Sequence, residues 1–260
     1  MICNMSTTEY LKKLEFWNQR ALTSEHPGSD DYVAKELEQK FIINNIPVKS
    51  RVLDIGCGDG STIHRLHQEK QVTGIGIDYS KEMINKAINR QMNSDILFIN
   101  KSMFLVSNED LGQFNVVYTQ RCLINLDSFE EQKKAINRIK GLLKPNGIFI
   151  MVEATLDGLE QTNKLRQTLG LNVILPPWHN LYFNINDVST LQTDDFFIEK
   201  IEEVSSTYYF ISRVIYAKQV TVQCEEPSYD SEINLLSAQL PQSICNCGPV
   251  KGLIWRKKGV

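Results

Sequence analysis

The segment Arg51–Gly60, RVLDIGCGDG, places a short apolar strand directly before an acidic, glycine-rich turn. Gly56, Gly58 and Gly60 lack a Cβ, so their backbone can adopt positive φ and approach a ligand closely. Ser61 then begins a predicted helix. A strand, a glycine-rich turn and a helix N-terminus form the βα unit that binds nucleotides in doubly wound α/β folds. The rest of the chain is therefore expected to continue such a fold.

The residues of this turn favour one kind of nucleotide over another. The dinucleotide fingerprint G-x-G-x-x-G ends in Gly or Ala, where this chain has Ser61, and it directs helix amides at an anionic pyrophosphate. Asp54 and Asp59 would repel a pyrophosphate but attract a ligand that carries an ammonium and a sulfonium group. A nucleotide-dependent oxidoreductase is accordingly the weaker alternative.

The composition of the chain argues against several classes of binding partner. The 260 residues are 42% apolar, and 28 basic against 31 acidic residues give a net charge of -3, so no global field attracts nucleic acid or an anionic membrane. No apolar run is long enough to cross a bilayer, and the N-terminus lacks the pattern of a signal peptide. The six cysteines are scattered and expected to be reduced, which favours a cytoplasmic location. Cys245-x-Cys247 has no second pair of ligands to complete a zinc site, so no metal is expected.

Strand and helix signals alternate as a doubly wound parallel sheet requires. The predicted strands are 51–55, 72–78, 96–100, 114–120, 148–154, 196–204 and 252–256. The turn Lys144-Pro145-Asn146-Gly147 separates a helix from the fifth strand. An insertion, 205–250, precedes the last strand; its part Thr207–Tyr216 is predicted helical and the remainder loop-like.

Two helices are predicted before the sheet. Ser6 with Glu9 forms a capping box for the first, and Ser29 or Asp30 caps the second. The helices either pack on the sheet edge, or a polar cluster within them forms a lid over the ligand. That cluster comprises Asn18, Arg20, Gly28, Ser29 and Asp30.

Three motifs together resemble the class I S-adenosylmethionine-dependent methyltransferases. They are the turn from Asp54 to Gly60, Asp78 with Tyr79, and the 144–147 turn, all within residues 45–155. The resemblance implies a Rossmann-like seven-stranded sheet of order 3-2-1-4-5-7-6 with the last strand antiparallel. It also implies one domain over 1–260, with an N-terminal helical cap (1–48), a cofactor-binding core (49–155) and substrate-side loops, insertion and last strands (156–260).

The implied cofactor is S-adenosyl-L-methionine. Asp78 closes the second strand, 24 residues after Asp54, where a carboxylate can accept both ribose hydroxyls. Ser102 stands where the family usually has Asp beside the adenine, and its hydroxyl can still accept a hydrogen bond. The predicted cofactor-binding residues are Asp54, Gly56, Cys57, Gly58, Asp78, Tyr79, Met83, Ser102, Met103 and Gln120.

Candidate catalytic residues lie at or just after the carboxyl ends of the strands that border the ligand, with Glu153 inside the fifth strand. His179, in the aromatic loop 176–184, is a general base or an ordinary structural histidine. Glu153 positions a substrate hydroxyl or pairs with Arg121, and Arg121 alternatively binds an anionic substrate group. Tyr208, Tyr209 and Arg213 either line the substrate side or pack within a helix.

The leading hypothesis is methyl transfer to a small-molecule acceptor. The loop after the fifth strand is similar to methyltransferases of bacterial polysaccharide biosynthesis, which suggests a sugar or glycan hydroxyl. The strand-four segment Thr119–Cys122 lacks the Asp/Asn-Pro-Pro-aromatic motif of nucleic-acid amino methyltransferases, and Pro176-Pro177-Trp178 lies on another loop. An N-methyltransferase of a small amine and a non-catalytic cofactor-binding subunit remain alternatives, and the sequence leaves the oligomeric state open.

Overall fold

Seven strands form a single mixed sheet in the computed structural model, which describes residues 7–90, 95–224 and 227–259. The order is β3-β2-β1-β4-β5-β7-β6, and β7 runs antiparallel to both of its neighbours. This confirms the predicted fold class and strand order. The strands are β1 (Arg51–Ile55), β2 (Thr73–Asp78), β3 (Ile96–Asn100), β4 (Phe114–Gln120), β5 (Leu143–Ala154), β6 (Phe196–Glu203) and β7 (Val250–Lys257).

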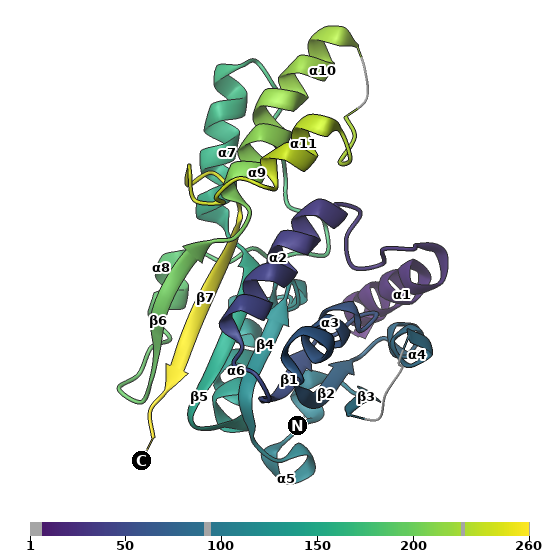
Figure 1. Cartoon of the computed structure of the whole chain (residues 1–260), viewed down its shortest axis with the longest axis vertical. Helices are drawn as coiled ribbons and strands as arrows, with labels where there is room; N and C mark the ends of the chain where they lie inside the picture. The colour runs from purple at the N-terminus through teal and green to yellow at the C-terminus, as the bar shows by residue number, and fades with distance from the viewer. Residues whose placement is uncertain (1–6, 91–94, 225–226, 260) are drawn as a thin grey trace.

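Helices cover both faces of the sheet, which explains why its central strands are apolar along almost their whole length (Figure 1). One face packs on α2 and α3 through residues such as Ile42 and Ile63, and the other packs on α6 through Ile136 and Ile139. The helices of this part are α1 (Thr7–Thr23), α2 (Tyr32–Asn45), α3 (Ser61–Lys70), α4 (Lys81–Arg90), α5 (Asn108–Leu111) and α6 (Phe129–Leu142), with the 3-10 turns η1 (Met103–Leu105) and η2 (Leu123–Asn125).

One local expectation is wrong, and another is met in a different form. The side chain of Asp31, not that of Ser29 or Asp30, caps α2, because its Oδ1 accepts the N–H of Ala34 at 3.0 Å. The predicted turn at 144–147 falls within the bounds of β5, where these residues bulge out of the pairing: Leu143 pairs with Phe114, Ile148 pairs with Val116, and Asn146 has φ of 61°. The proposed Ser6 cap of α1 lies outside the described residues.

The insertion before β7 is more ordered than expected. Its first part is helical as predicted, in α9 (Ser206–Phe210) followed by the π-helix η3 (Ile211–Tyr216). The part expected to be loop-like also contains α10 (Ala217–Gln223) and α11 (Glu232–Ser237). With α7 (Leu156–Thr168) these helices form an upper lobe (Figure 1), while α8 (Ile185–Ser189) lies beside the sheet.

Cys245 and Cys247 form a disulfide, so the expectation that they are free thiols is wrong. The bridge lies beside the start of α9, where the Ser206 hydroxyl accepts the N–H of Cys247 at 2.9 Å. Within the described ranges, no helix has the length and apolar character needed to span a bilayer, and no group of three or more His, Cys, Asp or Glu side chains forms a metal site.

Candidate active site

The glycine-rich turn after β1 uses its three glycines in different ways. All three have positive φ. A Cβ at Gly56 would overlap the Cys122 Sγ, and a Cβ at Gly60 would lie 2.7 Å from the Phe98 ring. At Gly58 the nearest atom would be the Met83 Sδ, at 4.0 Å. Gly56 and Gly60 therefore permit close packing within the protein, whereas Gly58 leaves open space for a ligand.

Asp78 links the ends of β1 and β2. Its Oδ2 accepts the N–H of Gly58 at 3.0 Å, and its Oδ1 accepts the N–H of Ser80 at 2.8 Å. Burial raises the pKa of Asp78 to about 6, although these N–H groups favour the ionised form. Each oxygen keeps lone pairs for a further donor, so the carboxylate can accept the two hydroxyls of a ribose.

Asp54 and Asp59 lie close together in the sequence but have different partners in the fold. Asp59 pairs with Arg90 at 2.8 Å and with Lys35 at 3.5 Å. Burial opposes ionisation of Asp59, but these two cations lower its pKa. Its charge is thus neutralised within the protein, and the expectation that it attracts a cationic ligand needs correction.

The position of Asp54 still suits the attraction of a cationic ligand. It is 2% exposed, and its Oδ2 accepts the Tyr118 hydroxyl at 2.7 Å. Burial raises the pKa of Asp54 to about 7, and the charges of Asp78 and Asp59 act in the same direction. A cation bound beside Asp54 would favour its ionised form.

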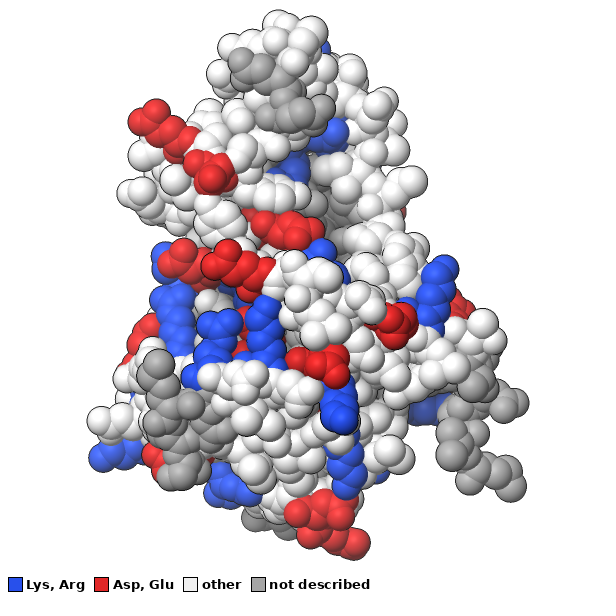
Figure 2. Space-filling model, turned by 90° about the vertical axis from the view of Figure 1, so that its right-hand side faces the viewer, with Lys and Arg blue, Asp and Glu red and all other residues white. Residues whose placement is uncertain are grey.

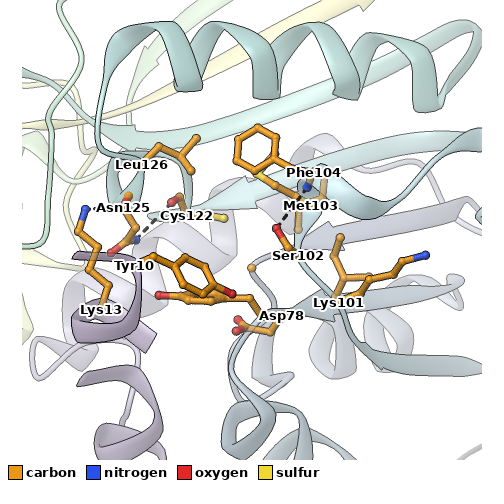
Figure 3. Close-up of a pocket in the computed structure, with 14 residues that line it drawn as sticks. Tyr10, Lys13, Asp78, Lys101, Ser102, Met103, Phe104, Cys122, Asn125 and Leu126 are labelled. Atoms are coloured by element: carbon orange, nitrogen blue, oxygen red, sulfur yellow. Dashed lines mark hydrogen bonds between the residues drawn. The ribbon is translucent and has the colours of Figure 1, made fainter. Parts of the chain in front are cut away.

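Three adjoining hollows meet at Gly56. The first is mainly apolar and includes the rings of Tyr10, Tyr79 and Phe104 (Figure 3). The second is charged and includes Lys35, and the third joins the two. All ten predicted cofactor residues line at least one hollow: Asp54, Gly56, Cys57, Gly58, Asp78, Tyr79, Met83, Ser102, Met103 and Gln120.

Ser102 is at the first hollow, on the loop after β3 (Figure 3). Its Oγ accepts the N–H of Phe104 at 3.4 Å, which caps η1. The hydroxyl proton stays available, so Ser102 can donate to an acceptor atom of a bound ring or accept from its amino group.

Gln120 and Arg121 project from the end of β4 into a buried network centred on Glu38 of α2. The Gln120 amide donates to Glu38 at 2.9 Å, and the Arg121 Nε donates to the same carboxylate at 2.7 Å. Gln120 also accepts the Thr62 hydroxyl at 2.8 Å. Sequence reasoning missed Glu38; its only signal is a charged residue next to Leu37 on the apolar stripe of α2.

Glu153 supports the wall of the site from behind. It is fully buried, and it accepts the N–H groups of Cys122 at 3.1 Å, Leu123 at 2.9 Å and Ile124 at 3.3 Å. Burial raises the pKa of Glu153 to about 7 against the effect of these bonds. The suggested pairing of Glu153 with Arg121 is wrong, because Arg121 pairs with Glu38. Glu153 also lines none of the three hollows.

His179 lies in an aromatic cluster one side chain away from the hollows. Its ring centre is 4.5 Å from that of Phe16 and 5.3 Å from that of Trp17, and Trp17 lines the third hollow. Its buried Nδ1 has no hydrogen-bond partner among the described residues. Burial lowers the pKa of His179 to about 4, and the charges of Lys13 and Arg20 add to this effect. The imidazole is therefore neutral at pH 7 and can accept a proton.

The N-terminal helices form part of the site itself. Tyr10, Lys13 and Trp17 of α1 line the hollows, a role that sequence analysis missed because the same helical face predicts packing on the sheet. Of the proposed lid cluster, Gly28 and Ser29 line the second hollow. Its other members are tied in place: Arg20 pairs with Asp30 at 2.7 Å, and Asn18 accepts the Ser80 hydroxyl at 2.7 Å.

These features fit S-adenosylmethionine. The open space at Gly58, the lone pairs of Asp78 and the apolar first hollow suit the ribose and the adenine. Asp54 and the charged second hollow suit the methionine end, which carries an ammonium, a carboxylate and the sulfonium.

A family model described as a methyltransferase domain matches residues 47–209. Bacillus subtilis YqeM is 35% identical over 115 residues, covering 43% of this chain and 45% of that protein. The protein-lysine N-methyltransferase efm4 of Schizosaccharomyces pombe is 31% identical over 132 residues, covering 43% of this chain and 55% of that protein. The aligned parts thus span about half the length of these curated relatives.

Solved structures share the fold. The magnesium protoporphyrin IX methyltransferase ChlM of Synechocystis PCC 6803, solved with bound SAM, superposes with a TM-score of 0.60 at 14% identity, covering 98% of this chain and 100% of that one. The N-methyltransferase NodS of Bradyrhizobium japonicum, in complex with S-adenosyl-L-homocysteine, gives a TM-score of 0.59 at 15% identity, covering 95% and 97%. At these identities the likeness concerns the fold alone.

Proposed function

Because the chain belongs to the S-adenosylmethionine-dependent methyltransferases, we propose that it methylates a small acceptor, with a sugar or glycan hydroxyl as the first candidate. The observation that carries this proposal is the group of three hollows around Gly56, which brings Asp54, Gly58 and Asp78 together at the carboxyl ends of β1 and β2. A ligand that fills them would extend to Gln120 and Arg121, the first residues of the acceptor side.

The bound cofactor supplies a methyl group already activated on a sulfonium. The chain's own residues then have to hold the cofactor and the acceptor, orient them toward each other and exclude water. Asp78 would fix the ribose, and Tyr79 and Met103 would enclose the adenine. Glu153 accepts hydrogen bonds from the N–H groups of Cys122–Ile124. These bonds keep the segment 122–124, which we call the post-β4 wall, in position. We assign Glu153 a positioning role on this basis.

A hydroxyl nucleophile must lose a proton as it attacks the methyl carbon. His179 is the proposed base, because its buried Nδ1 has no hydrogen-bond partner among the described residues and is free to accept a proton. Its lowered pKa keeps the imidazole neutral at pH 7 but makes it a weaker base than an ordinary histidine. Its ring borders Trp17, which lines the third hollow, so an acceptor seated beside Trp17 would come within reach. The aromatic rings of Trp17 and Trp178 suit the apolar face of a sugar.

The surface favours a small acceptor over nucleic acid. On the face drawn in Figure 2, Lys and Arg side chains lie close to Asp and Glu side chains across the middle of the molecule, and the part above carries fewer charged side chains, of both signs. Nucleic-acid recognition needs a basic patch or stripe. The names of the relatives refer to acceptors as different as protein lysine and a porphyrin, so acceptor identity has to come from this chain's own residues.

Calorimetry with the full chain tests the cofactor. We expect S-adenosylhomocysteine to bind and NAD not to bind. Asp78→Asn should weaken S-adenosylhomocysteine binding by about tenfold or more, since a hydrogen bond to a charged group contributes about 1.5–3 kcal/mol. Asp195→Asn is the matched control, because Asp195 is an exposed carboxylate that pairs with Lys140, and neither residue lines a hollow. Binding of NAD without S-adenosylhomocysteine would contradict the proposal.

A methyl-transfer assay with isotopically labelled cofactor tests the acceptor class. Sugars, glycan fragments and small amines are offered in parallel, and incorporation of label into a sugar hydroxyl is the expected result. Label in the amines alone would replace O-methylation by N-methylation. Cofactor binding with no transfer to any acceptor would favour a non-catalytic cofactor-binding subunit.

A further inference from the structure

Two arginines with partly exposed side chains lie on the side of the hollows that faces away from the adenine end, one of them lining the hollows and the other outside them. Arg121 follows β4 and lines the second and third hollows, and its side chain is 28% exposed. Arg213 belongs to the π-helix η3 in the insertion, and its side chain is 18% exposed. With Tyr182, Tyr209 and Tyr229 they form a group that we call the Arg–Tyr cluster.

A buried carboxylate stands behind each arginine. Glu38 is fully buried and accepts N–H groups of Arg121 and Gln120. Asp31 is 6% exposed and pairs with Arg213, while it also accepts the Tyr208 hydroxyl at 2.7 Å and the N–H of Ala34 at 3.0 Å. Because both carboxylates are already occupied on the buried side, they orient the guanidinium groups rather than compete for what binds in front of them.

Tyr209 packs on Arg213 and is within the electrostatic influence of Arg121. The Arg213 guanidinium carbon lies 5.0 Å from the centre of the Tyr209 ring and 4.7 Å from that of Tyr229. Burial raises the pKa of Tyr209, and the charges of Arg213 and Arg121 both oppose that rise, so both arginines act on the same phenol. Tyr182 is likewise under the charge of Arg121. Neither the Tyr182 nor the Tyr209 hydroxyl has a hydrogen-bond partner among the described residues.

Both arginines sit on irregular backbone. Arg121 has φ of 50°, in the left-handed region that a side chain other than glycine rarely adopts. Arg213 lies on six residues of π-helix within an otherwise α-helical stretch, a rare geometry that occurs frequently at functional sites. Strain of this kind persists where the surrounding structure fixes it, and it clusters at ligand-binding positions.

We infer that the Arg–Tyr cluster binds an anionic oxygen group, a carboxylate or a phosphate, on the acceptor. The acceptor is then an acidic sugar, a sugar acid or a sugar phosphate, rather than a neutral one. The planar fork of a guanidinium matches both groups, and the free phenol hydroxyls add donors. This inference rests on the proposed function, because it takes the space next to Arg121 as the acceptor side.

Binding to the full chain saturated with S-adenosylhomocysteine tests the inference. Hexuronates and hexose phosphates are titrated in a calorimeter beside the corresponding neutral hexoses. We expect at least one acidic sugar to bind about tenfold or more tightly than its neutral counterpart, a difference of about 1.4 kcal/mol. Equal affinity within every pair, or no binding of any acidic sugar, would overturn the inference.

Variants then locate the site. Arg213→Gln alone would leave the buried Asp31 uncompensated, so the double variant Asp31→Asn with Arg213→Gln removes both charges together. It should abolish the preference for acidic sugars, and Tyr209→Phe should reduce it, while neither changes affinity for S-adenosylhomocysteine. Arg65→Gln is the matched control, since Arg65 pairs with Glu69 on α3.

The outcomes separate the two proposals. Failure of the unaltered chain to bind S-adenosylhomocysteine would refute the proposed function itself. Normal S-adenosylhomocysteine binding with an acid preference that survives in the double variant would refute only the role of the Arg–Tyr cluster.

Discussion

Asp54 and Glu153 show that similar burial can serve different purposes at the residue scale. Burial raises the pKa of each to about 7. Glu153 is surrounded by three backbone N–H groups and lines no hollow, whereas Asp54 accepts one phenol hydroxyl and borders the second hollow. Glu153 is therefore committed to the protein, and Asp54 remains available to a cationic ligand.

His179→Ala tests the proposed base. We expect turnover to fall at least about tenfold, because general-base catalysis contributes about 10²–10⁴-fold, while affinity for the cofactor stays the same. With a pKa of about 4, the imidazole of the unaltered enzyme is deprotonated from pH 8 down to pH 6, so His179 should cause no loss of turnover in that range. His67→Ala is the control, since His67 lies on α3 and bonds to Val72. Unchanged turnover in His179→Ala would remove His179 from the mechanism.

At the scale of an element, we expect alanine substitutions at two glycines of the glycine-rich turn to have different effects. Gly56→Ala would drive a Cβ into Cys122 and should lower stability markedly. Gly58→Ala meets no protein atom closer than 4.0 Å, so it should cost about 1–2 kcal/mol for the left-handed backbone and act mainly on cofactor affinity. Urea unfolding and S-adenosylhomocysteine titration of both variants give the comparison. Equal effects of the two substitutions on stability would contradict this division.

The same turn shows why part of the fold was predictable. Strands and motifs such as Asp54–Gly60 and Asp78 are local in sequence, and their register follows from one repeated βα pattern. The short helices α10 and α11 were not predictable, because they have weak periodicity of their own: α10 continues the helical stretch of η3, and α11 is held by packing against η3. Glu38 was missed for a related reason: its partners, Gln120 and Arg121, are more than 80 residues away.

Titration of the buried carboxylates affects the whole molecule. Asp54, Asp78 and Glu153 have raised pKa values, so their contribution to stability is present below pH of about 4 and is lost as the pH rises through 6 and 7. The lowered pKa of Asp59 acts in the opposite direction, at lower pH. His179 also opposes, because its neutral form is favoured in the folded state, but three carboxylates outweigh one imidazole.

We therefore expect the ligand-free protein to be most stable between about pH 4 and pH 5, to lose stability up to about pH 7, and to level off above it. Urea midpoints measured at one-unit intervals of pH check this expectation. Glu153→Gln removes one of the three titrations and should flatten the curve, provided that the amide keeps the post-β4 wall in place. A midpoint that rises from pH 5 to pH 8 would contradict it.

The position of β7 has a consequence for the order in which the sheet can assemble. β6 precedes β7 in the chain but pairs only with β7 among the described strands. It can join the sheet only together with or after residues 250–257, which link it to β5 once the whole insertion has been looped out. The β3-β2-β1-β4-β5 part, which carries the cofactor hollows, needs no such delay. A nascent chain would thus complete the part that carries the cofactor hollows before the last strand is available to β6.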